Sequence, residues 1–424
     1  MKLTAYFHLF PPEHCAGSET TVHAALRAMV QRGHIVNVIC DRSITAPYEI
    51  DGIQVVRPLR RGVDSWLDSY VRDSNLLVTH LDLTSQAMQL AMRTRIPLVH
   101  FVHNDAQLMY WRVDARVPYK CALEVLNSHW LAAKPSRWQG IDRPEEWRGP
   151  SIVIHPVVEP HHYRCERGEK ITLVNPTPTK GADTFKALAQ LMPDYQFLAV
   201  EGGYGDQVIT ESGKHAASGN IAWMAHTPEI RNVFRQTKVL LMPSDYESYG
   251  RVGIEAACAG IPTVCHPTEG LKEAFGDAGI FIHRDDVNSW YAELTRLLTD
   301  EVYYRKRSDA VLALADSLDP EGEFNRLEKK LLETVARYKN GTTSMKMWTC
   351  DRYIWQLRDG NFKASDNERI PPDAVKLYAG KGTLIPEEEA RRHGWIGPDA
   401  KALHSPPEDK AMHGSENKRK GRAA

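Results

Sequence analysis

Short apolar runs rich in β-branched and aromatic residues alternate with longer amphipathic runs along most of the chain. The first strand pattern occupies residues 3–10, and a helical pattern with one apolar face follows at residues 20–33. Gly33 ends the helical pattern, and the next strand pattern begins directly after it, at residues 35–41. Such alternation is typical of parallel βαβ units, so the sequence predicts an α/β protein with doubly wound sheets.

The strand patterns form two series, each about the length of one domain. In the first series, further strands are expected at residues 74–82, 97–103, 123–128 and 151–157. In the second series they are expected at residues 170–176, 195–203, 220–226, 238–244, 260–266 and 279–283. We therefore predict two Rossmann-like domains, residues 1–165 and 166–340. An amphipathic segment at residues 323–338 is expected to close the second domain, with Leu327, Leu331, Leu332 and Val335 at helical spacing.

The remainder of the chain has a different character. Residues 345–405 are expected to form a small accessory domain, with a β-hairpin turning at Asp359-Gly360 and a helical piece within residues 370–395. Residues 406–424 are polar and end in the basic run KRKGR, so we expect a disordered tail.

Composition excludes several classes of protein. The 53 Lys and Arg nearly balance the 54 Asp and Glu, whereas a protein that coats nucleic acid needs a strongly basic face. The seven cysteines are an odd number without a C-x-x-C pair, which favours free thiols over a disulfide framework or a zinc knuckle. No apolar run reaches the ~18 residues of a membrane span, and the first apolar run is too short for a secretory signal. We expect a soluble, cytoplasmic protein.

Two carboxylates mark the most informative segment. A strand pattern ends at Pro243, Glu247 lies in the following loop, and Glu255 lies inside a helix that begins near Gly250. The unpaired backbone N–H groups at such a helix start favour an anion such as a diphosphate. Spacing alone leaves another interpretation equally open, with Glu247 as a helix cap and Glu255 as a solvated side chain.

The sequence around these carboxylates is PSDYESYGRVGIEA followed by AGIPTV. It resembles the E-x7-E region of the retaining nucleotide-sugar glycosyltransferases of family 4. Further segments match that family in the same order, namely AGSE, RGHIVNV, PLVHFVHND, VLNSHWLA, TKGADTF and GLKEAFGDAGIF. The resemblance covers roughly residues 1–340 and does not reach the C-terminal region.

The resemblance implies a GT-B fold, in which two Rossmann-like domains face a cleft and the second holds the nucleotide sugar. It implies that Glu255 binds the ribose hydroxyls and that Glu247 binds hydroxyls of the donor sugar, since a carboxylate accepts two hydrogen bonds from adjacent hydroxyls. It also implies that Lys180 neutralises the leaving diphosphate and that His103 contacts the sugar.

Six further residues are expected to bind the donor, and they come from the first loop, from the end of the strand at 170–176 and from the segment between the two carboxylates. They are Gly17, Asn175, Ser248, Tyr249, Gly250 and Arg251. Gly17 and Gly250 would allow close approach of the phosphates to the backbone. Asn175 stands where the family commonly has Arg, so Arg251 is expected to supply the second cation.

The expected reaction is transfer of a hexose from an NDP-sugar to an acceptor hydroxyl with retention of configuration. No D-x-D motif is present to bridge a divalent ion to the diphosphate, so we expect no metal and no cofactor beyond a UDP- or GDP-linked donor. The acceptor stays open between a protein, a DNA base, a lipid and a small glycan, without integral membrane association. The last segment has a slight resemblance to small domains of phage-encoded proteins, for which the location would be the host cytoplasm.

Two other functions stay open on the same architecture. One is a nucleotide-sugar epimerase or phosphorylase, and the other is a non-catalytic nucleotide-sugar-binding protein, because a fold alone does not determine function.

Overall fold

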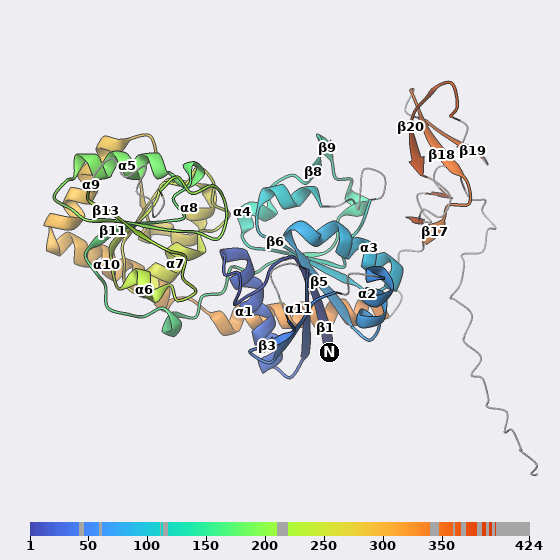
Figure 1. Ribbon diagram of the computed structural model, residues 1–424, viewed down its shortest axis with the longest axis horizontal. Helices are drawn as coiled ribbons and strands as arrows, with labels where there is room; N and C mark the ends of the chain where they lie inside the picture. The colour runs from blue at the N-terminus through green and yellow to red at the C-terminus, as the bar shows by residue number, and fades with distance from the viewer. Residues whose placement is uncertain are drawn as a thin grey trace, which may run out of the picture. The chain divides into compact units, whose positions relative to one another are not determined.

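The computed structural model describes residues 1–41, 46–58, 62–110, 112, 118–209, 219–339, 347–358, 361–365, 370–379, 384–386, 390–391 and 395. The chain divides into two compact units, residues 1–343 and 344–424. The first unit contains two parallel sheets with helices on both faces, which confirms the predicted doubly wound α/β class (Figure 1).

The first sheet has eight strands in the order β10-β7-β6-β5-β1-β2-β4-β3. Their bounds are β1 (Lys2–Phe7), β2 (Ile35–Cys40), β3 (Tyr48–Ile50), β4 (Ile53–Val56), β5 (Leu76–His80), β6 (Leu98–Val102), β7 (Leu123–Leu126) and β10 (Ser151–Val153). All neighbours are parallel except β3 and β4, an antiparallel edge hairpin that the sequence analysis did not predict.

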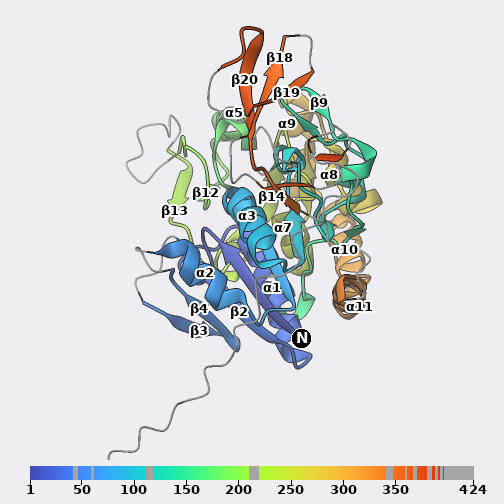
Figure 2. The same ribbon diagram turned by 90° about the vertical axis from the view of Figure 1, so that its right-hand side faces the viewer.

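Helices cover both faces of this sheet. Alternate residues of β1 point to opposite faces, so Leu3 and Phe7 pack with α1 (Gly17–Gln31), while Tyr6 packs with α2 (Val63–Val71) and α3 (Thr84–Thr94). Figure 2 shows α2 and α3 beside each other. The apolar strands are therefore buried on both faces, which explains why they appear as continuous apolar runs in the sequence.

Helix α11 (Pro320–Lys339) does not pack where the sequence analysis placed it. Its buried residues Phe324, Leu327 and Leu331 join the core of the first sheet, beside α1, and the orange helix is visible there in Figure 1. Leu332 is 45% exposed and does not contribute to that core. The helical periodicity predicted an apolar face, but periodicity does not say which sheet that face will cover. The domain limits themselves remain a prediction.

The second sheet has six parallel strands in the order β13-β12-β11-β14-β15-β16. Their bounds are β11 (Lys170–Val174), β12 (Phe197–Val200), β13 (Ile221–Met224), β14 (Thr237–Met242), β15 (Thr263–Cys265) and β16 (Ile280–Phe281). One face is covered by α5 (Ala182–Leu191) and α9 (Val287–Thr299). The other is covered by α6 (Arg231–Phe234), α7 (Arg251–Cys258) and α8 (Glu269–Phe275), and α10 (Glu301–Asp316) contributes to both cores.

Shorter elements complete the first unit. They are α4 (His129–Ala132), the two-stranded β8 (Arg137–Trp138) and β9 (Ile141–Asp142), and 3₁₀ helices at Leu81–Leu83, Asp105–Met109, Glu145–Trp147, Pro160–His162, Pro178–Lys180 and Gly276–Ala278.

The second unit is built from short antiparallel strands. β17 (Met347–Thr349) pairs with β21 (Leu384–Pro386), and β18 (Tyr353–Leu357) lies between β19 (Phe362–Ser365) and β20 (Ala374–Ala379). A small core of Cys350, Ile354, Ala390 and Trp395 packs within the unit.

The predictions for this unit had mixed outcomes. The β18–β19 hairpin is present, although Asp359-Gly360 itself and the basic tail at 406–424 lie outside the described residues. The helical piece expected within 370–395 is wrong for much of its length, because β20 and β21 occupy it. The sequence AVKLYA alternates with period two, and its backbone pairs with β18.

All seven cysteines are free thiols, as their spacing predicted. Among the described residues, no helix combines the length and the apolar character that crossing a bilayer demands.

Candidate active site

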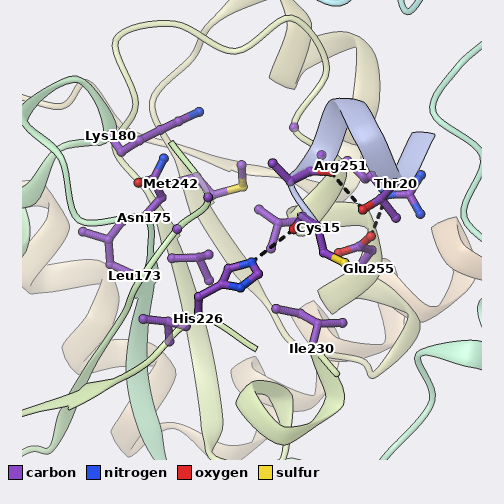
Figure 3. A pocket seen from close by; sticks show the side chains of 18 of the residues that line it. Cys15, Thr20, Leu173, Asn175, Lys180, His226, Ile230, Met242, Arg251 and Glu255 are labelled. Carbon is purple, nitrogen blue, oxygen red and sulfur yellow. Dashed lines mark hydrogen bonds and ion pairs between the residues drawn. The ribbon is translucent and has the colours of Figure 1, made fainter. Parts of the chain in front are cut away.

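A cavity of about 400 Å³ lies in the first unit, where the strand ends of the second sheet meet the loop before α1. Seven of the ten predicted site residues line it, namely Gly17, Asn175, Lys180, Glu247, Gly250, Arg251 and Glu255. Figure 3 shows Lys180 and Asn175 on one side and Arg251 with Glu255 on the other. Segments far apart in the sequence thus bring two cations and the two predicted carboxylates around one space, which Glu201 also lines.

Lys180 and Glu247 form an ion pair at this cavity. The distance between Lys180 Nζ and Glu247 Oε1 is 2.5 Å, and the Ser244 hydroxyl donates to the same oxygen at 3.0 Å. The side chains are 28% and 14% exposed, so a ligand in the cavity can reach both. The pair offers an ammonium to an anion and a carboxylate to hydroxyl groups.

Arg251 and Glu255 form a second, more buried pair one helical turn apart on α7. Arg251 Nε lies 2.7 Å from Glu255 Oε1, and the side chains are 9% and 10% exposed. The guanidinium also donates to the Val157 carbonyl at 2.9 Å and to the Tyr163 hydroxyl at 3.0 Å. Burial opposes the charge of Arg251, but Tyr163 and Glu255 outweigh it and raise the pKa of the guanidinium.

These pairs decide between the two interpretations of the carboxylates. No side chain caps α7, whose N-cap is Gly250, and Glu255 is buried. Glu247 is therefore not a cap and Glu255 is not solvated. Both carboxylates face cations instead.

The two predicted glycines have different reasons to be glycine. A Cβ at Gly17 would meet nothing within 4 Å, so the absence of a side chain leaves room in the cavity. Gly250 has φ +88°, and a Cβ there would lie 2.4 Å from Leu271 Cδ2. Conformation and packing against α8 thus require Gly250, in addition to any approach of a ligand.

Asn175 is held at the end of β11 in a left-handed conformation, with φ 63°. Its side-chain oxygen accepts a hydrogen bond from Gln207 Nε2 at 2.6 Å. An amide pair thus occupies the position where the resembling family commonly has a cation. Lys180 and Arg251 are the Lys and Arg side chains among the described residues that line the cavity.

The other three predicted residues do not line the large cavity. His103 follows β6, is 9% exposed, and borders a cavity of about 10 Å³. Burial lowers its pKa to about 4. Ser248 accepts a hydrogen bond from Asn127 at 2.8 Å, and Tyr249 is buried and stacks on His155. The backbone carbonyl of His103 accepts from the same Asn127 amide at 3.0 Å, so His103 stays close to the Glu247 loop.

Sequence reasoning missed several polar residues of the cavity, among them Tyr163, Tyr204 and His226. Tyr163 bonds Arg251, and Tyr204 donates to Glu19 at 2.5 Å from a loop that begins Gly202-Gly203. His226 follows β13 and contacts the Cys15 carbonyl through Nε2 at 3.2 Å. Tyr204 and His226 follow predicted strands, so their position at the carboxyl edge of the sheet was an available signal.

The second half of this unit has a counterpart among known families. Residues 173–311 match the family described as glycosyl transferases group 1. Eight of the ten predicted site residues fall within these matched residues, and Gly17 and His103 lie outside them.

Curated proteins similar to this chain include the O-antigen chain mannosyltransferase B of Escherichia coli, which is 26% identical over 169 residues. That match covers 36% of this chain and 42% of the mannosyltransferase, so the chain spans less than half of this relative.

Among solved structures, sucrose-phosphate synthase from Thermosynechococcus elongatus has a TM-score of 0.63 at 16% identity, covering 79% of this chain and 100% of that chain. Anabaena HepE in complex with UDP-glucose has a TM-score of 0.62 at 14% identity, covering 78% and 99%. Both are similar to this chain in fold. The predicted GT-B fold, with two Rossmann-like domains, is confirmed.

Proposed function

We propose that this protein is a glycosyltransferase that moves a hexose from an NDP-sugar to an acceptor hydroxyl with retention of configuration. The observation that carries the proposal is the cavity in which the Lys180–Glu247 pair and the Arg251–Glu255 pair surround the start of α7. The match of residues 173–311 to glycosyl transferases group 1 supports it. A UDP-glucose complex of the structurally similar HepE supports an NDP-sugar donor.

In this proposal the diphosphate lies at the start of α7, beside Lys180. The backbone N–H groups near Gly250 and the ammonium of Lys180 stabilise the charge that grows on the leaving phosphate. Asn175 and Ser248 add polar contacts, and Tyr249 holds the loop through its stack on His155. No metal ion bridges the diphosphate, and no cofactor besides the donor is required.

The two carboxylates bind different parts of the donor. Glu255 accepts from the ribose hydroxyls, and its ion pair with Arg251 orients the carboxylate. Glu247 accepts from hydroxyls of the sugar, and binding exchanges part of its bond with Lys180 for bonds to the ligand. His103 contributes to the site from the first domain. The Asn127 amide bonds both the His103 carbonyl and the Ser248 hydroxyl, which keeps His103 near the Glu247 loop.

In the proposed reaction, the acceptor oxygen attacks C1 of the sugar from the same face from which the leaving phosphate departs. The bond from the acceptor oxygen to C1 forms as the bond from C1 to the phosphate oxygen breaks, and the hydroxyl proton passes to that phosphate oxygen. Gly17 leaves space for the donor at this face. We further propose that the protein acts in the cytoplasm, where free thiols such as its seven cysteines are kept reduced.

The donor can be found before the acceptor is known. UDP-, GDP- and dTDP-sugars are screened by thermal unfolding, since a bound ligand stabilises the fold by ~2.7 kcal/mol at a hundredfold excess over Kd. The selected donor is then incubated with and without Mg²⁺ after chelator treatment, and transfer to water or to an acceptor is followed by NMR of the released sugar. The proposal expects initial retention of the anomer and no stimulation by Mg²⁺.

Two results would contradict the proposal. Efficient epimerisation of the donor without any acceptor would indicate an epimerase, and donor binding without any bond cleavage across a broad acceptor panel would indicate a binding protein.

A further inference from the structure

The first domain contains a buried cluster that the proposed transfer does not use. His8 follows β1, Glu19 lies in the first turn of α1, and His80 ends β5. Their exposed fractions are 2%, 0% and 0%. β1 and β5 are parallel neighbours, so their carboxyl ends meet at the same edge of the sheet, where α1 also begins.

The side-chain atoms of this cluster are arranged for coordination. One ring nitrogen from each histidine and one Glu19 oxygen all lie within 4.8 Å of one another. Movements on the order of 1 Å would bring the three atoms to the ~2.0–2.2 Å that Zn²⁺ has with His nitrogen and carboxylate oxygen. Two histidines and a carboxylate are a ligand set that such an ion uses.

His80 supplies a second, independent indication. Its Nε2 is buried without a hydrogen-bond partner, and its Nδ1 lies 3.2 Å from His103 Nε2. A buried polar atom without a partner has lost its hydrogen bonds to water and gained none in return, so native structures rarely retain one without a reason. A ligating histidine commonly has its other nitrogen fixed by a partner, and His103 fills that position here.

The charges around the cluster also suit a cation. No Lys or Arg among the described residues forms an ion pair with Glu19. Its oxygens accept from the hydroxyls of Ser18 and Tyr204, which leaves lone pairs because a carboxylate has about four acceptor sites.

The other groups of potential ligands among the described residues are already engaged. They are His100–Cys121–Glu124, His129–His155–Glu273 and Glu159–His161–His162. Arg143 neutralises Glu124, Arg27 pairs with Glu159, and the backbone N–H groups of His129 and Trp130 donate to Glu273. The cluster of His8, Glu19 and His80 differs because neither an Arg side chain nor a backbone N–H group among the described residues binds its carboxylate.

We infer that His8, Glu19 and His80 form a binding site for one divalent transition-metal ion of the zinc type, separate from the diphosphate. The ion joins β1, α1 and β5 at the edge of the cavity. It also fixes the Glu19 carboxylate that receives the Tyr204 hydroxyl, so it stabilises the Gly202–Gly205 loop, which borders the large cavity. This inference does not depend on the proposed transfer.

The test is metal uptake by the full chain. Chelator-treated protein is titrated with Zn²⁺ under equilibrium dialysis and with Co²⁺ as an optical probe, and bound metal is measured per chain. We expect one ion per chain, a higher thermal midpoint with Zn²⁺, and a Co²⁺ spectrum without the thiolate charge-transfer band that a cysteine ligand would add.

Variants locate the ion. His80→Gln and Glu19→Gln should weaken binding by more than ~100-fold, which exceeds the usual loss of an outer partner. Glu19→Gln retains an oxygen for the Tyr204 hydroxyl, so it serves if His80→Gln fails to fold. His162→Gln, in the exposed cluster, is the matched control and should leave binding unchanged.

The inference is overturned if the folded wild-type chain takes up no stoichiometric Zn²⁺ or Co²⁺. It is also overturned if Glu19→Gln binds as wild type does, or if His162→Gln is the variant that loses the ion.

Discussion

Polar side chains gather at the carboxyl edges of both parallel sheets, but the two edges differ in the charge of those side chains. At the second sheet, Lys180 and Glu247 form one ion pair and Arg251 and Glu255 form another, all bordering a cavity of about 400 Å³. At the first sheet, the side chains at the strand ends are the buried histidines His8, His80 and His103, and the cavity beside His103 is about 10 Å³.

The difference teaches that topology selects where polar groups gather, while side-chain chemistry selects what they bind. Paired charges that remain partly exposed can exchange partners with a charged ligand. Imidazole rings enclosed by protein are suited instead to hydrogen bonds between ring nitrogens or to binding a metal ion. In the proposed function, the tandem fold thus separates the binding of a diphosphate from the chemistry of the other domain.

The largest effect is expected for the buried pair of α7. Arg251→Met leaves the Glu255 carboxylate buried without a cation, which should lower the free energy of unfolding by about 3–5 kcal/mol. Replacing both residues, as Arg251→Met with Glu255→Leu, removes the orphaned charge and should recover most of that loss. Urea unfolding measures both, and a double variant no more stable than the single one would contradict the pairing.

The partly exposed pair of Lys180 and Glu247 should matter more for turnover than for stability. Lys180→Ala removes the cation beside the leaving phosphate, so kcat should fall by about 10²–10³-fold. Lys186→Ala is the matched control, because both lysines have 28% exposed side chains and ion-pair partners, but Lys186 pairs with Asp183 away from the cavity. Equal turnover of the two variants would remove Lys180 from the site.

The histidines at the carboxyl edge of the first sheet should instead make the free energy of unfolding depend on pH. Burial lowers the pKa of His103 to about 4, whereas the ordinary value is 6.5. Above pH 6.5 neither state binds the proton. Between pH 6.5 and 4 the unfolded chain binds a proton that the folded chain does not, so the free energy of unfolding decreases as pH falls, by about 2 kcal/mol at pH 5.

His103→Gln should remove this part of the pH dependence. Urea unfolding at pH 7, 6 and 5 compares the variant with wild type, and the exposed His161→Gln is the control. Parallel pH profiles for wild type and His103→Gln would show that His103 is protonated alike in both states.

The smallest change in stability is expected for the hydrogen bond that joins the loop after β12 to the first turn of α1. Tyr204 donates from the second domain to the buried Glu19 of the first at 2.5 Å. Tyr204→Phe should therefore lower stability by about 1 kcal/mol, while Tyr291→Phe should change it by less than ~0.5 kcal/mol. The comparison is matched in exposure, at 41% and 42%, and thermal unfolding measures it. Equal midpoints would mean that the hydroxyl bond to Glu19 contributes nothing.

Local patterns in the sequence predicted the strands of both sheets except β3 and β4, because parallel strands buried on both faces must be apolar throughout. They did not predict which sheet α11 covers, since its apolar stripe fits either surface and only the three-dimensional packing selects one. The edge hairpin of β3 and β4 was also missed, because short edge strands carry a weak periodic signal. The strand β20 was missed although its sequence alternates with period two.

The candidate site was predictable to a similar degree. Glu247 and Lys180 were expected to act on a ligand, but their mutual pairing across the sheet edge depends on tertiary structure. The Arg251–Glu255 pair had a sequence signal, because residues four apart share a helix face. Tyr163 was not signalled, since it reaches the cavity from the connection between the two sheets.

The position of the bound nucleotide can be measured directly by amide hydrogen exchange of the protein with and without UDP or GDP. We expect new protection at residues 175–181 and 247–255, around the paired charges, and little change at the ends of β5 and β6. Protection concentrated at His80 and His103, with none near Gly250, would contradict the assignment of the diphosphate to the second domain.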